Sequence, residues 1–152
     1  MSLETIHASA VRVGETGILI LGASRSGKSA LALDLIDQCQ LRGVPAILVG
    51  DDRIVIEIRN GQPTARHAPQ LAGLIEVRGS GIHTIKYVAA TALHLAVRLV
   101  EPAQSVRLPD AELQQILPGV FLPLLSLPLG QPAVRAVLAH LGYYGGVKRL
   151  LK

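Results

Sequence analysis

The chain has 152 residues, of which 49% are hydrophobic and only 17% charged, and this composition excludes an intrinsically disordered protein. A chain of this length can bury a sizeable core, so we expect residues 1–152 to form a single domain. The formal net charge of +4 weakly favours an acidic or phosphorylated partner. One Phe, three Tyr and no Trp argue against a stacking surface for nucleic acid.

Targeting signals are not expected in this sequence. The first five residues include no basic stretch and no long apolar segment, so we expect no secretion signal. Prolines at 118, 123 and 128 interrupt the most hydrophobic stretch, and no run approaches the about 18 apolar residues of a membrane span. The single cysteine, Cys39, cannot form an internal disulfide. We therefore expect a cytoplasmic protein that does not enter a membrane.

The first elements of the chain are predicted to be two strands and a helix. Residues 6–13 alternate as a strand does, and a glycine-flanked turn leads into the continuously apolar run 17–21, which is typical of a strand buried on both faces. From residue 28 to residue 42 the apolar residues recur with helical spacing. Gly43 and Pro45 are expected to end this helix, and Cys39 is expected on its apolar face.

A nucleotide-binding motif lies between the second strand and this helix. The pattern G-x-x-x-x-G-K-[ST] is formed by Gly22, Ala23, Ser24, Arg25, Ser26, Gly27, Lys28 and Ser29. Its glycines let backbone N–H groups converge on phosphate oxygens at a helix N-terminus. Lys28 can then reach the β- and γ-phosphates, and the hydroxyl of Ser29 can ligate Mg²⁺. The strand and helix on either side are the context that this motif requires, so the sequence predicts a P-loop.

Two adjacent acids follow the next predicted strand, residues 46–50. In a nucleotide-binding α/β sheet, an acid at the carboxyl end of a strand beside the P-loop can meet Mg²⁺ or accept a proton. Because neighbouring side chains of an extended chain point in different directions, one of Asp51 and Asp52 can face the metal and the other the acceptor. The alternative is an Asp-Asp turn that leads into a strand at 53–58.

The remaining segments are predicted from turn signals and periodicity. They are a turn at 60–63, a loop at 64–70, a strand with one packed face at 92–100, a short helix opened by residues 107–110 and continuing to Leu117, a proline-broken edge strand at 120–129, and a helix at 132–151 that Gly142 or Gly145-Gly146 ends or kinks. Together with the upstream elements, these segments indicate an α/β fold with a mixed sheet.

Residues 73–82 place Glu76 and Arg78 beside the bend Gly79-Ser80-Gly81. Taken alone, this pattern is typical of a solvated ion pair, although the glycines could also bring backbone amides close to phosphate. His7 lies on the first predicted strand, next in the sequence to the nucleotide motif. A lone histidine is more often structural than catalytic.

Several separated segments of the chain resemble one family, the catalytic domain of HPr kinase/phosphorylase. They are His7, the P-loop, residues 48–52, and the run Glu76-Val77-Arg78-Gly79-Ser80-Gly81-Ile82, which resembles the family signature E-[IV]-R-G-x-G-I. The signature is far more specific than a P-loop alone. The resemblance covers essentially the whole chain, is weakest after Arg107, and is to the short form without an N-terminal domain.

This resemblance implies a fold and an activity. The fold is a P-loop α/β domain related to bacterial phosphoenolpyruvate carboxykinase, assembled as a homo-oligomer, usually a hexamer. The activity is ATP- and Mg²⁺-dependent phosphorylation of a serine in the phosphocarrier protein HPr. The same family site also runs in reverse, taking the phosphate back with inorganic phosphate and releasing pyrophosphate.

The resemblance also implies roles for particular residues. His7 would lie in the active site, Lys28 would bind the phosphates, and Ser29 with Glu76 would hold Mg²⁺. The catalytic acid that accepts the serine proton matches Asp52 best, with Asp51 beside it. Arg107 aligns with an active-site arginine of the family.

The chain departs from the family pattern in one functional segment. Where the family has P-V-R-P-G-R-N, which serves dephosphorylation, this chain has Leu127-Pro128-Leu129-Gly130-Gln131-Pro132-Ala133, without either arginine. Two other readings of the whole sequence remain open at this point. One is a P-loop kinase of a small molecule, and the other is a non-catalytic scaffold that senses nucleotide.

Overall fold

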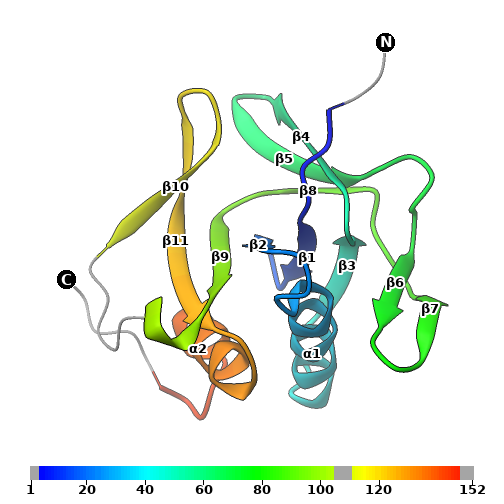
Figure 1. Cartoon of the computed structure of the whole chain (residues 1–152). Helices are drawn as coiled ribbons and strands as arrows, with labels where there is room; N and C mark the ends of the chain where they lie inside the picture. Colours follow the sequence, from blue (N-terminus) through cyan, green and yellow to red (C-terminus); the bar gives the residue numbers. More distant parts are fainter. Residues whose placement is uncertain (1–3, 105–110, 148–152) are drawn as a thin grey trace.

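The computed structural model describes residues 4–104 and 111–147, which form eleven strands, two α-helices and one 3₁₀ turn (Figure 1). In chain order they are β1 (Ser9–Val13), β2 (Thr16–Gly22), α1 (Lys28–Leu41), β3 (Ala46–Gly50), β4 (Ile54–Arg59), β5 (Gln62–His67), β6 (Leu74–Val77), β7 (Gly81–Thr84), β8 (Ala90–Ala92), β9 (Leu95–Val100), the 3₁₀ turn η1 (Pro102–Gln104), β10 (Glu112–Leu117), β11 (Val120–Pro128) and α2 (Gln131–Leu141).

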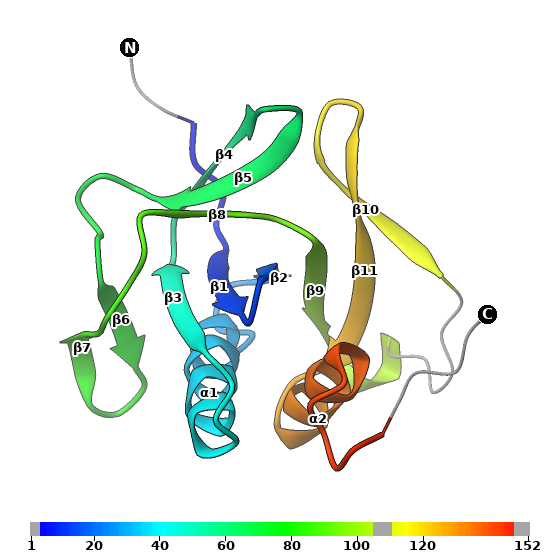
Figure 2. The same ribbon diagram turned by 180° about the vertical axis from the view of Figure 1, so that it is seen from behind.

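The elements stack in three layers around a mixed six-stranded sheet. Its strand order is β10-β11-β9-β2-β1-β3, and β9 runs parallel to both of its neighbours while the other pairs are antiparallel. Both helices cover one face of this sheet, and the small sheet β4-β5-β8 crosses the opposite face (Figures 1 and 2). The hairpin β6–β7 lies to one side, next to β3 and α1. This confirms the predicted α/β class with a mixed sheet, a helix after the nucleotide motif and a C-terminal helix.

The central strands are buried on both faces because each face meets a different apolar layer. Val11, Ile18 and Ile20 point into the core beneath the two helices. Their neighbours Ala10 and Leu19 point into the second core beneath β4-β5-β8. The continuous apolar run 17–21 was therefore correctly predicted as a strand without a solvent face.

Gly17 is a position where the fold tolerates no side chain. A Cβ atom at this residue would lie 1.8 Å from the carbonyl oxygen of Ala92, where the connection from β8 to β9 crosses β2. We expect Gly17→Ala to lower the free energy of unfolding by about 3 kcal/mol, because backbone must shift to make room. Urea unfolding measures this change.

Gly61 provides the comparison for that substitution. It has a φ of +76°, and an added Cβ would meet nothing within 4 Å. Gly61→Ala should therefore cost only the backbone strain of the left-handed region, about 1 kcal/mol. Equal losses of stability in the two variants would contradict the steric explanation at Gly17.

The predicted loop at 64–70 was wrong over most of its length. Residues 62–67 form β5, which pairs with β4 through a tight hairpin. The turn uses Asn60 and Gly61, both with positive φ, as in the two-residue turns that match the twist of a hairpin. Pro63 and the alternation of polar and small residues obscured this strand, whose partner β8 lies nearly thirty residues further along the chain.

The predicted strand at 92–100 was wrong at its start and in its packing. The strand is interrupted at Leu93 and His94. The segment before the interruption, β8, belongs to the small sheet, and the segment after it, β9, belongs to the large sheet. His94 accepts a hydrogen bond from the backbone N–H of Gly17 on Nδ1, 3.0 Å away, and holds the break against β2. β9 is the middle parallel strand and is buried on both faces, with Ala96 in the second core.

The predicted short helix after residue 107 was also wrong within the described residues. Residues 112–117 form the strand β10, which pairs with β11 across a turn at Pro118 and Gly119. The spacing of Leu113, Ile116 and Leu117 is compatible with a helix, but the turn at Pro118 and Gly119 instead joins this segment to β11 as a hairpin. Residues 107–110 themselves lie outside the described part of the chain.

β11 was predicted correctly as a strand but wrongly as an edge strand, because β10 forms the edge of the sheet. Its first half pairs with β10 as far as Leu124, and its second half pairs with β9 from Leu124 onward. Each half therefore has a single hydrogen-bonded neighbour. Pro123, which has no N–H to donate, is tolerated for this reason.

The C-terminal helix is shorter than predicted. α2 ends at Leu141, where Gly142 adopts a left-handed φ of 86° and its N–H returns to the carbonyl of Ala139. The prediction that Gly142 ends or kinks the helix is confirmed, whereas the continuation toward residue 151 is not. Residues 148–152 lie outside the described part of the chain.

Neither helix in the described residues has the length and apolar character needed to cross a bilayer.

Candidate functional site

A cleft of about 540 Å³ opens between the β2–α1 loop, the first half of α1 and the β6 strand. Its walls include most of the residues selected from the sequence, although these are distant along the chain. The cleft is lined by His7, Ser9, Arg25, Gly27, Lys28, Ser29, Ala30, Leu33, Asp34, Asp52, Glu76, Val77, Arg78 and Leu129. Its size and mixed lining are those of a small-molecule site.

The β2–α1 loop presents the N-terminus of α1 to this cleft. Gly22, Arg25 and Gly27 all have positive φ, and a Cβ at Gly22 would lie 2.4 Å from the hydroxyl of Ser26. This winding turns the chain tightly back before α1 begins at Lys28. Within the described residues no side chain caps the helix start. The first N–H groups of α1 are therefore available to an anion.

Lys28 is almost fully buried at the floor of the cleft. Its ammonium group donates hydrogen bonds to the carbonyls of Gly22 and Ala23, both at 2.9 Å. Burial lowers the pKa of Lys28, and the negative charges of Asp52 and Asp51 oppose that shift. A phosphate could replace the two carbonyls as the partner of this cation.

Asp51 is buried and serves as an acceptor for three segments. The hydroxyl of Ser9 donates to Oδ1 at 2.6 Å, and the hydroxyl of Ser29 lies 2.7 Å from Oδ1 and 2.9 Å from Oδ2. The backbone N–H of Glu76 adds a longer bond of 3.4 Å to Oδ2. These contacts join β1, the start of α1 and β6 at one carboxylate.

Asp52 points the other way, toward solvent and the cleft. Its φ is 72°, and the N–H of Arg53 bonds the carbonyl of Asp51 at 2.8 Å, so Asp52 is the centre of a three-residue γ-turn. An L-residue in this conformation is strained, and such strain is concentrated at functional sites. The side chain is 62% exposed and pairs with Nε2 of His7 at 3.0 Å. The turn thus separates the environments of two consecutive acids.

The β6–β7 hairpin supplies the opposite wall. Glu76 and Arg78 are exposed and line the cleft, and the bend between the strands uses Gly79 and Gly81 with positive φ. Within the bend, the hydroxyl of Ser80 lies 2.7 Å from Nε2 of His83 on β7. No ion pair between Glu76 and Arg78 is found in the described residues, so the expected solvated pair does not form there and both charges face the cleft.

The oxygen donors at this end of the cleft fit a magnesium ion held largely by a nucleotide. Within residues 4–104 and 111–147 there is no cluster of three or more His, Cys, Asp and Glu side chains that could hold a metal alone. Ser29 donates its only hydroxyl proton to Asp51, which leaves its oxygen lone pairs for a cation. Mg²⁺ commonly binds through one or two such protein groups together with phosphates and water.

Some residues of the cleft were not selected from the sequence. Ser9 lies two positions after His7 and begins a strand made mostly of small and apolar residues. A polar side chain among such residues was the sequence signal that could have indicated a functional role. Asp34 lies on α1 beside the cleft, and partial burial, with Asp37 nearby, raises the pKa of its carboxyl group. Leu129 directly follows β11. Arg107 lies outside the described residues.

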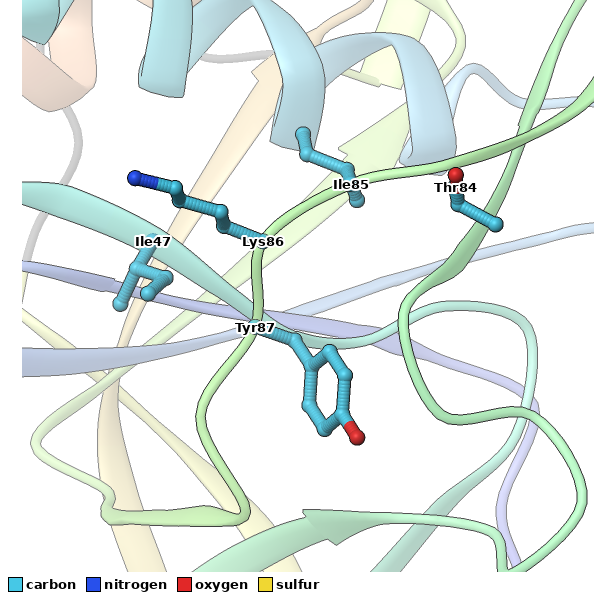
Figure 3. Close-up of a pocket in the computed structure, with 5 residues that line it drawn as sticks. All are labelled: Ile47, Thr84, Ile85, Lys86 and Tyr87. Atoms are coloured by element: carbon cyan, nitrogen blue, oxygen red, sulfur yellow. The ribbon is translucent and has the colours of Figure 1, made fainter.

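A second hollow lies at the outer edge of β3 and does not share any lining residue with the cleft (Figure 3). It is open and lined by Ile47, Thr84, Ile85, Lys86 and Tyr87. Lys86 and Tyr87 extend in different directions, and Lys86 is the only charged lining residue. The hollow therefore lacks the convergent polar groups of the cleft.

Comparison with known proteins gives one consistent family. HPr kinase/phosphorylase of Limosilactobacillus reuteri is 31% identical over 137 residues, covering 83% of this chain and 41% of that protein. The corresponding protein of Burkholderia lata is 33% identical over 134 residues, covering 86% of this chain and 40% of the relative. That of Mycoplasma mycoides subsp. mycoides SC is 42% identical over 79 residues, covering 52% of this chain and 23% of the relative. The chain thus spans less than half the length of these curated relatives.

A solved structure and a family model agree with these relatives. The structure of the Hpr(Ser) kinase/phosphatase from Coxiella burnetii has a TM-score of 0.70 at 29% identity, covering 84% of this chain and 81% of that one. The family model described as HPr Serine kinase C-terminal domain matches residues 1–138. The arrangement of the cleft and these matches lead to one conclusion: the chain belongs to the HPr serine kinase C-terminal domain family.

Proposed function

We propose that this chain is an ATP- and Mg²⁺-dependent protein kinase that phosphorylates a serine of the phosphocarrier HPr. The observation that supports this most is the meeting of Lys28, Ser29 and Asp52 around one cleft. Family membership supplies the substrate class, because the relatives are HPr kinase/phosphorylases. No observation favours a small-molecule kinase or a nucleotide-sensing scaffold.

In this proposal the nucleotide binds through charge and backbone geometry. The uncapped N-terminus of α1 and the loop from Gly22 to Ser29 surround the β- and γ-phosphates. Lys28 leaves its carbonyl partners and contacts the phosphates, while Arg25 and Arg78 add positive charge at the rim. Positioning and neutralisation of charge of this kind supply most of the catalysis in phosphoryl transfer.

Ser29 and Glu76 would hold Mg²⁺ with the phosphates, and the cation would neutralise charge that develops on the transferring group. The serine oxygen of the acceptor attacks the γ-phosphorus, and the bond from that phosphorus to the β-bridging oxygen breaks. Asp52 accepts the serine proton, because it is the member of the Asp51–Asp52 pair that lines the cleft. His7, 3.0 Å from Asp52, holds that carboxylate in place.

The test is incubation of the full chain with ATP, Mg²⁺ and purified HPr, followed by intact-mass measurement. We expect HPr to gain the mass of one phosphate on a serine, and to gain nothing when ATP is replaced by ADP. Nucleotide binding without transfer to HPr would overturn the proposal in favour of a sensing module. Phosphorylation of a metabolite in the absence of any protein acceptor would overturn it in favour of a small-molecule kinase.

We also propose that the reverse reaction is slow in this chain. In that direction inorganic phosphate attacks the phosphoserine phosphorus, the serine oxygen leaves with a proton from Asp52, and pyrophosphate forms. Two anions must then approach each other, which requires cations. Segment 127–133 contains no cation and contributes the apolar side chain of Leu129 to the cleft. With phosphoserine-HPr, phosphate and Mg²⁺, we expect pyrophosphate to form at least about tenfold more slowly than HPr is phosphorylated. Equal rates would contradict this explanation.

The remaining proposals concern the protein as a whole. We propose that residues 1–152 form one catalytic domain that works in the cytoplasm without membrane or nucleic-acid partners. We propose a homo-oligomer, a hexamer by resemblance to the family, and light scattering of the purified chain tests the stoichiometry.

A further inference from the structure

Ser9 is a buried hydroxyl whose role the proposed reaction does not require. It lies on β1 with no exposed surface, and its hydroxyl bonds the same oxygen of Asp51 as the hydroxyl of Ser29 on α1. A buried hydroxyl has given up its hydrogen bonds with water, so it destabilises the fold unless it donates a hydrogen bond within the protein. Ser9 donates to Oδ1 of Asp51 at 2.6 Å, and this is the shortest of the bonds that reach the carboxylate.

The carboxylate of Asp51 is held from two sides by hydroxyl groups. Ser9 approaches Oδ1 from β1, and Ser29 approaches both oxygens from the first turn of α1. The N–H of Glu76 is more distant, at 3.4 Å. Without Ser9, Ser29 would be the only close donor. The carboxylate could then rotate about its Cβ–Cγ bond and carry the Ser29 proton with it.

The direction of that proton decides what the Ser29 oxygen offers to the cleft. A serine hydroxyl has one proton and two lone pairs. When the proton points to Asp51, the lone pairs are free for a cation beside the phosphates. When it points into the cleft, the hydroxyl repels a cation. The orientation of Asp51 therefore controls the affinity of this end of the cleft for a metal.

We propose that Ser9 is a positioning residue for the binding of the magnesium–nucleotide complex. Its hydrogen bond fixes the carboxylate of Asp51, and Asp51 in turn keeps the proton of the Ser29 hydroxyl directed away from the cation. The inference deepens the proposed function and rests on it for the identity of the ligand. It also explains a spacing in the chain. His7 and Ser9, two residues apart, hold the two adjacent acids, His7 the exposed Asp52 and Ser9 the buried Asp51.

The test compares nucleotide affinity with and without the metal. Calorimetric titration of the full chain with a non-hydrolysable ATP analogue is carried out in Mg²⁺ and again in EDTA. For Ser9→Ala we expect the dissociation constant in Mg²⁺ to rise about tenfold, as is typical when a residue that supports a metal ligand is removed. The dissociation constant in EDTA should stay within about twofold, because the hydroxyl of Ser9 donates to Asp51 and not to a phosphate-binding group.

Two further variants of Ser9 separate the hydroxyl from the volume. Ser9→Thr keeps the donor, and we expect it to restore the affinity measured in Mg²⁺. Ser9→Cys keeps nearly the same volume with a weak donor, and it should behave as Ser9→Ala does. The cysteine variant also keeps the test decisive if the cavity left by alanine unfolds the protein.

Thr64→Val is the control for a general loss of stability. Thr64 is likewise buried, on β5, and its hydroxyl donates to the carbonyl of Gln62 away from the cleft. It should lower the unfolding temperature without changing the ratio of the affinities in Mg²⁺ and EDTA. A Ser9→Ala protein in which both affinities change equally, or neither changes, would show that Ser9 is only a satisfied core residue. Because these measurements need no acceptor, they stand even if HPr is not the substrate.

Discussion

Replacement of Lys28 by methionine is expected to reduce kcat/KM for phosphorylation of HPr about a thousandfold. Lys28 is the buried cation at the floor of the cleft, and methionine keeps its length without its charge. Steady-state phosphorylation of HPr with varied ATP measures the loss. The fold should survive, because the substitution removes a desolvated charge and, within the described residues, Lys28 forms no ion pair that would be broken.

The matched control for this variant is Lys86→Met. Lys86 is exposed and lies in the second hollow, outside the lining of the cleft (Figure 3). Its removal makes the same change in net charge, so any effect of long-range electrostatics on binding an anionic substrate appears in both variants. We expect Lys86→Met to keep full activity. A folded Lys28→Met protein with normal turnover would refute the assignment of the phosphate-binding lysine.

Asp52→Asn is expected to lower kcat by about a hundredfold to ten-thousandfold while leaving the affinity for Mg²⁺–ATP nearly unchanged. The amide cannot accept the serine proton. Asparagine tolerates the left-handed φ of 72° at this position. The exposed contact with His7 contributes at most about 1 kcal/mol, so the fold should persist. Single-turnover kinetics with saturating nucleotide isolates the chemical step.

Asp51→Asn should behave differently because its carboxylate is buried. Ser9 donates to Oδ1, the Glu76 N–H to Oδ2, and Ser29 approaches both oxygens, so an amide nitrogen in place of either oxygen would leave one of these donors without an acceptor. We expect a loss of about 2 kcal/mol in the free energy of unfolding and weaker binding of nucleotide in Mg²⁺. If Asp51→Asn abolished the chemical step at saturating Mg²⁺ while Asp52→Asn turned over normally, the roles of the two acids would be exchanged.

Local signals in the sequence were sufficient for the elements that lead into the cleft. The apolar run before Gly22 and the helical spacing after Lys28 predicted β2 and α1 because each pattern belongs to a single element. The acids at the end of β3 and the bend between β6 and β7 were visible for the same reason. The predictions failed where a strand has a weak pattern of its own and its pairing decides the structure. β5 becomes a strand by pairing with β4 and with the distant β8, and β10 becomes one by pairing with its neighbour β11.

The candidate site shows the same division. The P-loop pattern, the acid pair and the signature around Glu76 could all be read from short stretches, because the chemistry of phosphate and metal demands particular side chains at particular spacings. The separate environments of Asp51 and Asp52 could not be read in this way. These environments result from the γ-turn at Asp52 and from the approach of β1 and α1 to Asp51. The hydrophobic periodicity of a sequence does not predict a turn of that kind.

The amino-acid order alone was thus enough to indicate an α/β protein with a phosphate-binding loop, two candidate acids and a likeness to one kinase family. Only the tertiary structure shows that Asp51 is buried and that Asp52 faces the cleft. It also shows that Ser9 contacts Asp51. Burial and hydrogen bonding depend on segments more than forty residues apart, as the bond from Ser9 to Asp51 illustrates with a separation of 42. Such contacts are products of packing, and packing is a property of all the elements together.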